Sequence, residues 1–129
     1  MQLANAVVLV TGANPGIGLA FAQEALARGA RRVYAAARDP ADVQLPGVVP
    51  LRLDVTDPAQ VARAARDCGD VTLLVNNAGV AETGGFLEAG ALDATRRQLE
   101  VNVFGMLRMA QAFAPVLAAH GGGTIVNLL

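Results

Sequence analysis

The segment that most constrains this chain is the glycine-rich stretch Thr-Gly-Ala-Asn-Pro-Gly-Ile-Gly at residues 11–18, which directly follows the apolar run at residues 7–10. A buried strand that runs into such a turn and then into an amphipathic helix presents backbone N–H groups and a helix N-terminus to an anion. The glycines would permit a tight turn, a close approach of phosphates and close packing of the helix. The stretch therefore predicts a site for the pyrophosphate of a dinucleotide. Its candidate residues are Gly12, Asn14, Gly16, Ile17 and Gly18.

Apolar runs and helical patterns alternate along the rest of the chain. Strands that are apolar over nearly their whole length, in a repeated β-α-β order, are typical of a parallel sheet that helices cover on both faces. Because no linker or repeat interrupts this order, residues 1–129 are predicted to form a single α/β domain. The predicted strands are 6–11, 32–37, 48–53, 71–75 and 124–129; the predicted helices are 16–28, a helix capped by Thr56 that runs to about residue 68, and 92–119 with a kink at Pro115; residues 81–90 are predicted to be a loop.

The composition excludes several classes of protein. A chain that is 53% hydrophobic and 16% charged is globular rather than disordered. Its net charge of −1 offers no basic surface for nucleic acid. We expect no apolar stretch of the roughly 18 residues that span a membrane, and no signal peptide, because the N-terminus lacks a basic start. The single cysteine, Cys68, can form no internal disulfide, which fits a cytoplasmic protein, and no metal site is expected.

A second motif, Asn-Asn-Ala-Gly at residues 76–79, follows the fourth predicted strand. Ligands of open α/β sheets bind beyond the carboxyl ends of the strands, near the point where the strand order reverses. Alone, this motif or the first could be an ordinary turn. Together, at the ends of two strands that would be neighbours in a doubly wound sheet, they favour one dinucleotide site.

The two motifs, together with Asp54-Val55 and Asn102, resemble the classical type of the short-chain dehydrogenase/reductase family over essentially the whole chain. The resemblance implies a Rossmann-type doubly wound parallel sheet of strand order 3-2-1-4-5, an NAD(P)-binding domain that stops after the fifth strand. It implies that Asp54 and Val55 border the adenine ring, and that Asn102 holds the asparagine position of the catalytic tetrad, which positions a water. It also implies a homo-oligomer, and places Asn77, Ala78 and Gly79 along the cofactor cleft.

The end of the second strand decides between the two cofactors. An acidic side chain there would accept hydrogen bonds from the ribose 2′-OH of NAD and repel the 2′-phosphate of NADP. Ala37 stands where the family usually carries that acid, and Arg38 follows with a guanidinium that pairs well with phosphate. NADP is therefore expected rather than NAD. Asp39, which could engage Arg38, and Pro15, where many NADP-preferring relatives carry a basic residue, weaken this expectation.

The chemistry that the resemblance implies is hydride transfer between a nicotinamide and a carbonyl or alcohol substrate. In that family a Tyr is the general acid/base, a Lys lowers its pKa and a Ser polarises the substrate oxygen. This chain has no Ser and no Lys, and its one Tyr, Tyr34, lies on the second strand, so its four-residue spacing to Arg38 is discounted. Three interpretations stay open: the cofactor-binding part of an oxidoreductase, an inactive dinucleotide-binding or interaction module, and a truncated fragment without a function of its own.

Overall fold

The computed structural model describes residues 1–128 as a five-stranded parallel sheet of order β3-β2-β1-β4-β5. This confirms the predicted Rossmann-type strand order. Leu129, the last residue of the predicted fifth strand, lies outside the described residues. The elements in chain order are β1 (Val7–Val10), α1 (Ile17–Ala27), β2 (Arg32–Ala37), the 3₁₀ turn η1 (Pro40–Asp42), β3 (Val49–Arg52), α2 (Pro58–Asp67), β4 (Leu73–Asn76), α3 (Ala91–Leu99), the π-helical turn η2 (Glu100–Gly105), α4 (Met106–Ala119) and β5 (Thr124–Asn127).

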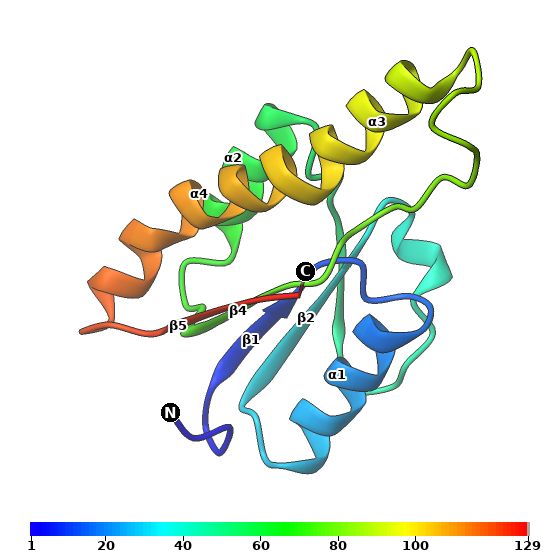
Figure 1. Ribbon diagram of the computed structural model, residues 1–129. Helices are drawn as coiled ribbons and strands as arrows, with labels where there is room; N and C mark the ends of the chain where they lie inside the picture. The colour runs from blue at the N-terminus through cyan, green and yellow to red at the C-terminus, as the bar shows by residue number, and fades with distance from the viewer. Residues whose placement is uncertain (129) are drawn as a thin grey trace.

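Two separate apolar clusters fill the two sides of the sheet. Helix α1 packs on one side, whereas α2 and α4 pack on the other (Figure 1). Strands β1 and β4 are buried along their whole length, as the near-continuous apolar runs predict. The largest buried side chains on the α2 and α4 side are those of Leu9, Leu74, Met109 and Phe113. The carboxyl ends of the three inner strands, β2, β1 and β4, are thereby held on a rigid scaffold.

The start of α2 differs from the sequence-based prediction. Its N-cap is Asp57 rather than Thr56, because the Asp57 carboxylate accepts hydrogen bonds from the N–H groups of Ala59 and Gln60. The hydroxyl of Thr56 donates instead to the carboxylate of Asp54. A carboxylate one residue closer to the helix reaches its free N–H groups better, so the aspartate took the capping position.

The predicted long helix at 92–119 is continuous from Ala91 to Ala119, but it changes geometry in its middle. Residues Glu100–Gly105 form a π-helical turn, whereas Pro115 lies within the regular helix α4. By length and composition this helix reaches the size of a membrane span, which the sequence was not expected to contain. Its residues Met109 and Phe113 are fully buried against the sheet, although only 22% of its most apolar stretch is buried.

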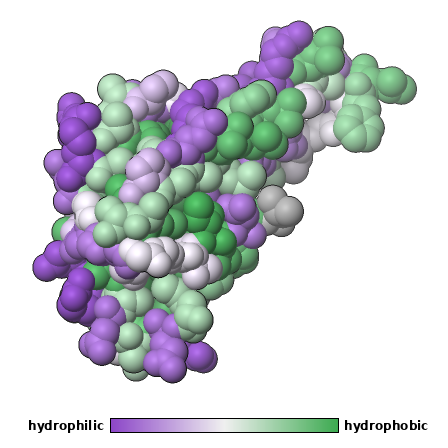
Figure 2. All heavy atoms as spheres, turned by 90° about the vertical axis from the view of Figure 1, so that its left-hand side faces the viewer, coloured by the Kyte–Doolittle hydropathy of each residue, from purple (hydrophilic) through white to green (hydrophobic). Residues whose placement is uncertain are grey.

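The N-terminal half of this helix projects from the body of the molecule (Figure 1). Phe86 and Leu87, in the loop before α3, are almost completely exposed at the tip of the projection, and Leu92 is exposed beside them. The space-filling view shows hydrophobic side chains gathered at this end (Figure 2). On the α1 side of β4 and β5 an apolar groove of about 390 Å³ is lined in part by Phe21, Leu73 and Val126.

Candidate functional site

The glycine-rich stretch forms a turn whose shape depends on its glycines. Gly12 and Gly16 have φ angles of +59° and +75°, a region that glycine adopts without strain. A Cβ on Gly18 would lie 2.0 Å from the carbonyl oxygen of Gly12, so the turn folds directly onto the start of α1. A Cβ on Gly16 would meet no atom within 4 Å. The turn is therefore closed at Gly18 and open to an approaching group at Gly16.

Thr11 ties this turn to the Asn-Asn-Ala-Gly segment. Its hydroxyl oxygen accepts hydrogen bonds from the N–H groups of Asn77 (3.0 Å) and Ala78 (2.9 Å). The side-chain amide of Asn77 donates in return to the carbonyl oxygen of Gly12 at 2.9 Å. The two motifs are thus one hydrogen-bonded unit, although more than sixty residues separate them in the chain.

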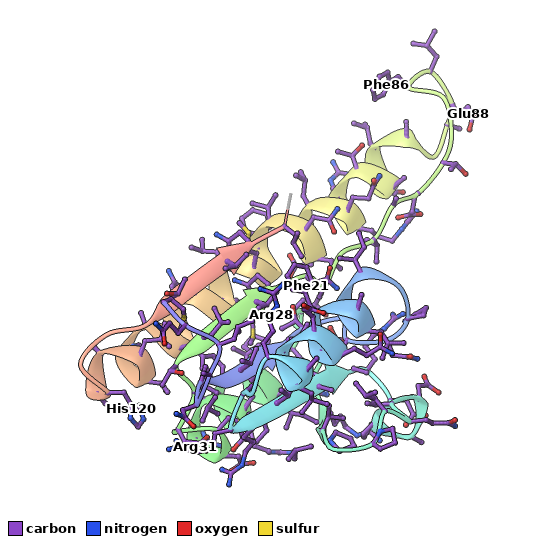
Figure 3. The ribbon with its side chains drawn as sticks, turned by 90° about the horizontal axis from the view of Figure 1, so that it is seen from below. Phe21, Arg28, Arg31, Phe86, Glu88 and His120 are labelled. Atoms are coloured by element: carbon purple, nitrogen blue, oxygen red, sulfur yellow. The ribbon has the colours of Figure 1, made fainter. Side chains whose placement is uncertain are left out.

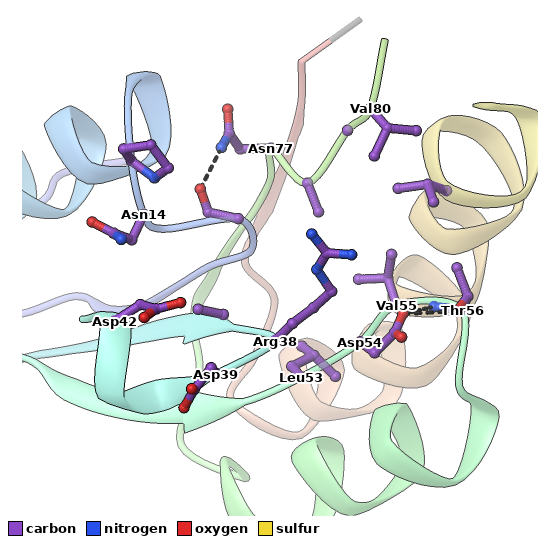
Figure 4. A pocket seen from close by; sticks show the side chains of 16 residues that line it. Asn14, Arg38, Asp39, Asp42, Leu53, Asp54, Val55, Thr56, Asn77 and Val80 are labelled. Atoms are coloured by element: carbon purple, nitrogen blue, oxygen red, sulfur yellow. Dashed lines mark hydrogen bonds between the residues drawn. The ribbon is translucent and has the colours of Figure 1, made fainter. Parts of the chain in front are cut away.

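A cavity of about 480 Å³ opens at the carboxyl ends of β1, β2, β3 and β4 (Figure 4). This is where the reversal of strand order in an open α/β sheet is expected to create a ligand crevice. Its walls come from the glycine turn, the residues after β2, the residues after β3 and the segment after β4. The lining residues are Gly12, Asn14, Pro15, Ala37, Arg38, Asp39, Asp42, Leu53, Asp54, Val55, Thr56, Asn77, Ala78, Gly79, Val80 and Val101.

Arg38 extends into this cavity from the end of β2 (Figure 4). Within residues 1–128 it has no ion-pair partner. The carboxylate of Asp39, which could have neutralised it, accepts a hydrogen bond from the N–H of Ala41 and caps the turn η1. The carbonyl oxygen of Arg38 accepts a hydrogen bond from Arg52 at 3.0 Å. The guanidinium is consequently available to an anion.

The wall after β3 offers one acceptor and one donor. The hydroxyl and the backbone N–H of Thr56 donate to the Asp54 carboxylate at 2.7 and 2.9 Å, and these bonds, with a smaller contribution from Arg38, hold the pKa of Asp54 below its usual value. Asp54 is therefore ionised at neutral pH and accepts hydrogen bonds. The N–H of Val55 makes no hydrogen bond within residues 1–128. A planar group with a donor beside an acceptor would match this edge.

Asn102 lies in the π-helical turn, outside the cavity wall. Its side chain forms two hydrogen bonds with the backbone of Val80, accepting from the N–H and donating to the carbonyl oxygen, both at 2.8 Å. A Cβ on Gly79 would lie 3.3 Å from its Oδ1. Asn102 thus holds the segment that leaves β4, and π-helical turns are frequent at functional sites.

Of the predicted site residues, eight line the cavity, while Gly16, Ile17, Gly18 and Asn102 stand beside it. The sequence did not single out Thr11 as an anchor, although it opens the glycine motif. It also missed Arg108, whose contact with Val55 joins residues far apart in the chain and leaves no local pattern. The eight lining residues are Gly12, Asn14, Arg38, Asp54, Val55, Asn77, Ala78 and Gly79.

The other reactive side chains lie away from the cavity. The hydroxyl of Tyr34 donates to Asp70 at 2.8 Å, at the amino end of the sheet. Burial raises the pKa of the Cys68 thiol to about 12, so it is a neutral, apolar group at physiological pH. His120, at the end of α4, has its Nε2 2.7 Å from the carbonyl oxygen of Gly69. None of the three lines the cavity, which agrees with discounting the spacing of Tyr34 to Arg38.

Comparison with known proteins gives a consistent picture. A family model described as short chain dehydrogenase matches residues 6–129. L-xylulose reductase of Homo sapiens is 42% identical over 132 residues, and galactitol 2-dehydrogenase (L-tagatose-forming) of Cereibacter sphaeroides is 41% identical over 137 residues; each alignment covers 98% of this chain. A crystal structure of a short-chain dehydrogenase from Burkholderia cenocepacia in complex with NADP superposes on the whole chain with a TM-score of 0.94 and 45% identity.

The chain spans about half the length of the proteins it matches. The alignments cover 53% of both curated relatives and 55% of the Burkholderia chain. The matched half is the one that contains the glycine turn and the cavity described above.

Proposed function

The chain belongs to the short-chain dehydrogenase family, and we propose that it binds NADP in the cavity at the carboxyl end of the sheet. The observation that carries the choice of NADP is the free guanidinium of Arg38 beside Ala37, where an acid would select NAD. The doubt raised by Asp39 has a physical answer, because its carboxylate is engaged as the cap of η1. The Burkholderia relative in complex with NADP supports the same choice.

The remaining groups divide between the parts of the dinucleotide. The pyrophosphate would lie on the open side of the glycine turn, formed by Gly12, Asn14, Gly16, Ile17 and Gly18. Adenine presents an amino donor beside a ring-nitrogen acceptor, which suits the Asp54 carboxylate and the free N–H of Val55. In this proposal Asn77, Ala78 and Gly79 line the continuation of the cleft toward the nicotinamide, and Asn102 keeps that segment in place through Val80.

The experiment that tests this assignment compares two cofactors and two arginines. Calorimetry on the unmodified chain should show NADP binding about ten- to a hundred-fold more tightly than NAD, the range expected for a charge-assisted contact to phosphate. Arg38→Ala should remove that difference and leave the affinity for NAD unchanged. The matched control is Arg31→Ala, an exposed arginine at the opposite end of the sheet (Figure 3). Equal affinities for NADP and NAD in the unmodified chain would contradict the role of Arg38.

For the whole protein we propose reduction of a carbonyl group or oxidation of the corresponding alcohol. The bound nicotinamide would supply or accept the hydride, and the substrate oxygen must gain or lose a proton at the same time. A Ser and a Lys are absent from these 129 residues, and Tyr34 is paired with Asp70 away from the cavity. The groups that move this proton must therefore come from outside this stretch of sequence.

The absence of Ser and Lys from these 129 residues favours a second candidate function for this chain by itself. It would be a dinucleotide-binding module without catalytic activity. Without a general acid–base pair, the rate of the reaction is expected to be roughly 10²- to 10⁴-fold lower. NADPH oxidation would be followed with a panel of carbonyl substrates that begins with ketoses, because several relatives carry names such as L-xylulose reductase and galactitol 2-dehydrogenase. Saturable oxidation by the chain alone would exclude the inactive module.

We further propose that residues 1–129 form one NAD(P)-binding domain and that it acts in the cytoplasm. The buried Cys68, which forms no disulfide, supports this location. The exposed apolar residues of the long helix, among them Leu99, Val103 and Leu107, support self-association, as the family resemblance implies.

A further inference from the structure

The wall of the cavity beside Val55 is held by a residue on a different element, Arg108 of α4. The Arg108 Nη1 donates to the carbonyl oxygen of Val55 at 3.2 Å, and its Nη2 donates to the Glu100 carboxylate at 2.5 Å. The Arg108 side chain is 29% exposed and that of Glu100 43% exposed. One guanidinium thus joins the cavity wall to the start of the π-helical turn.

The backbone of the helix meets the same residue at close range. A Cβ on Gly105 would lie 2.5 Å from Cγ2 of Val55, so the helix rests directly on this side chain. Val55 is buried, and its N–H is the free donor described above. A shift of the helix relative to Val55 would therefore displace that donor together with the cavity wall.

Two neighbours of Val55 are fixed by other means. The N–H of Asp54 donates to the side-chain oxygen of Gln60 on α2 at 2.8 Å. The N–H of Thr56 donates to the Asp54 carboxylate. Arg108, on helix α4, supplies the side-chain hydrogen bond to Val55 itself.

We propose that Arg108 is a positioning residue: by holding the carbonyl group of Val55, it restrains the backbone of that residue, including the N–H of the preceding peptide unit, and so determines how well the pocket distinguishes adenine from other purines. This inference rests on the proposed binding of a dinucleotide in this cavity. Adenine requires a donor at Val55 and an acceptor at Asp54 in one plane. Hypoxanthine reverses both requirements, because it carries an oxygen in place of the amino group and a protonated ring nitrogen. A cavity wall whose donor and acceptor are fixed in position discriminates between these two bases. A wall whose donor and acceptor can move would bind either base.

The test measures a ratio of affinities. Calorimetry would give the dissociation constants for NADP and for its deamino analogue, in which hypoxanthine replaces adenine. The unmodified chain should prefer NADP by at least about tenfold, because the deamino analogue loses the charge-assisted hydrogen bond to Asp54 as well as the one from the Val55 N–H. Arg108→Met keeps much of the apolar stem and removes the guanidinium. It should weaken NADP binding about three- to tenfold and reduce the preference to about threefold or less.

The matched control is Arg96→Met, the same substitution on the same continuous helix. Arg96 pairs only with the exposed carboxylate of Asp93 within residues 1–128, and it does not line the cavity. Its variant should keep both affinities. A cooperative unfolding transition would show that Arg108→Met is folded. If that transition is absent, Arg108→Gln would be measured instead, because it also lacks the guanidinium and is more polar.

Two results would overturn the proposal, and they differ from each other. An unchanged ratio in a folded Arg108 variant means that the residue stabilises the fold without setting the pocket. A chain that binds neither nucleotide overturns the proposed cofactor site, and the role of Arg108 with it. A ratio that falls in the Arg108 variant and not in the Arg96 variant supports the positioning role.

Discussion

At the amino end of the sheet Asp70 joins two other polar side chains, whereas at the carboxyl end one guanidinium and one backbone N–H have no partner within residues 1–128. Asp70 accepts hydrogen bonds from both Arg32 and Tyr34, and His120 reaches the carbonyl oxygen of Gly69 (His120 is labelled in Figure 3). At the other end Arg38 has no ion pair and the Val55 N–H no hydrogen bond among residues 1–128.

This difference indicates that the amino end of the sheet contributes to the stability of the fold and that the carboxyl end serves ligand binding. Paired groups at the amino end contribute a modest stability and have no capacity left for a ligand. Unpaired groups at the carboxyl end contribute no such stability, but they are available to a ligand. Substitutions at the two ends should therefore have different signatures. Those at the carboxyl end should affect binding, and those at the amino end should affect stability alone.

The largest effect is expected for Gly18→Ala at the carboxyl end. The new methyl group would lie 2.0 Å from the carbonyl oxygen of Gly12, so the turn must open. We expect NADP binding to be lost and the free energy of unfolding to fall by about 3 kcal/mol or more. Gly90→Ala is the control, since a methyl group there meets no atom within 4 Å. Calorimetry would measure the NADP affinity, and urea denaturation the free energy of unfolding. A Gly18→Ala variant that binds NADP normally would contradict the assignment of binding to the carboxyl end.

A smaller effect is expected for Thr11→Val, which has nearly the same shape without the hydroxyl. The N–H groups of Asn77 and Ala78 would lose their acceptor, with a cost of about 2 kcal/mol in the free energy of unfolding. NADP affinity should fall as well, because the two motifs would no longer be joined. Thr11→Ser retains the hydroxyl and should retain most of the affinity. Equal affinities in the valine and serine variants would show that the link does not serve binding.

The smallest effect is expected at the amino end. Asp70→Ala removes the partner of Arg32 and Tyr34, and it should lower the free energy of unfolding by about 1 kcal/mol while the affinity for NADP stays the same. Asp93→Ala, in an exposed pair with Arg96, should change neither quantity by a measurable amount. A substantial loss of NADP affinity in Asp70→Ala would show that the two ends are coupled.

Local patterns in the sequence predicted the strands and the glycine turn, whereas the strand order and the place of Asp54 and Val55 were expected from the family resemblance. Apolar runs reveal strands, and the glycine turn is a contiguous motif, so both can be recognised without tertiary information. The N-cap at Asp57 was missed because two adjacent residues had suitable side chains, and only the geometry chooses between them. The π-helical turn and the contact of Arg108 with Val55 depend on how a helix meets a distant loop, which periodicity does not encode.

The strand order also has a consequence for the time course of folding. Val8 at the centre of the sheet pairs with Val33 on one side and with Leu73 on the other. A chain that emerges from the ribosome in order can pair β1 with β2 and then β3 early, because those contacts are close in sequence. The second edge of β1 then waits unpaired until β4 has been synthesised. The most buried strand of the finished domain is thus an open edge during synthesis, when association with other nascent chains is its main hazard.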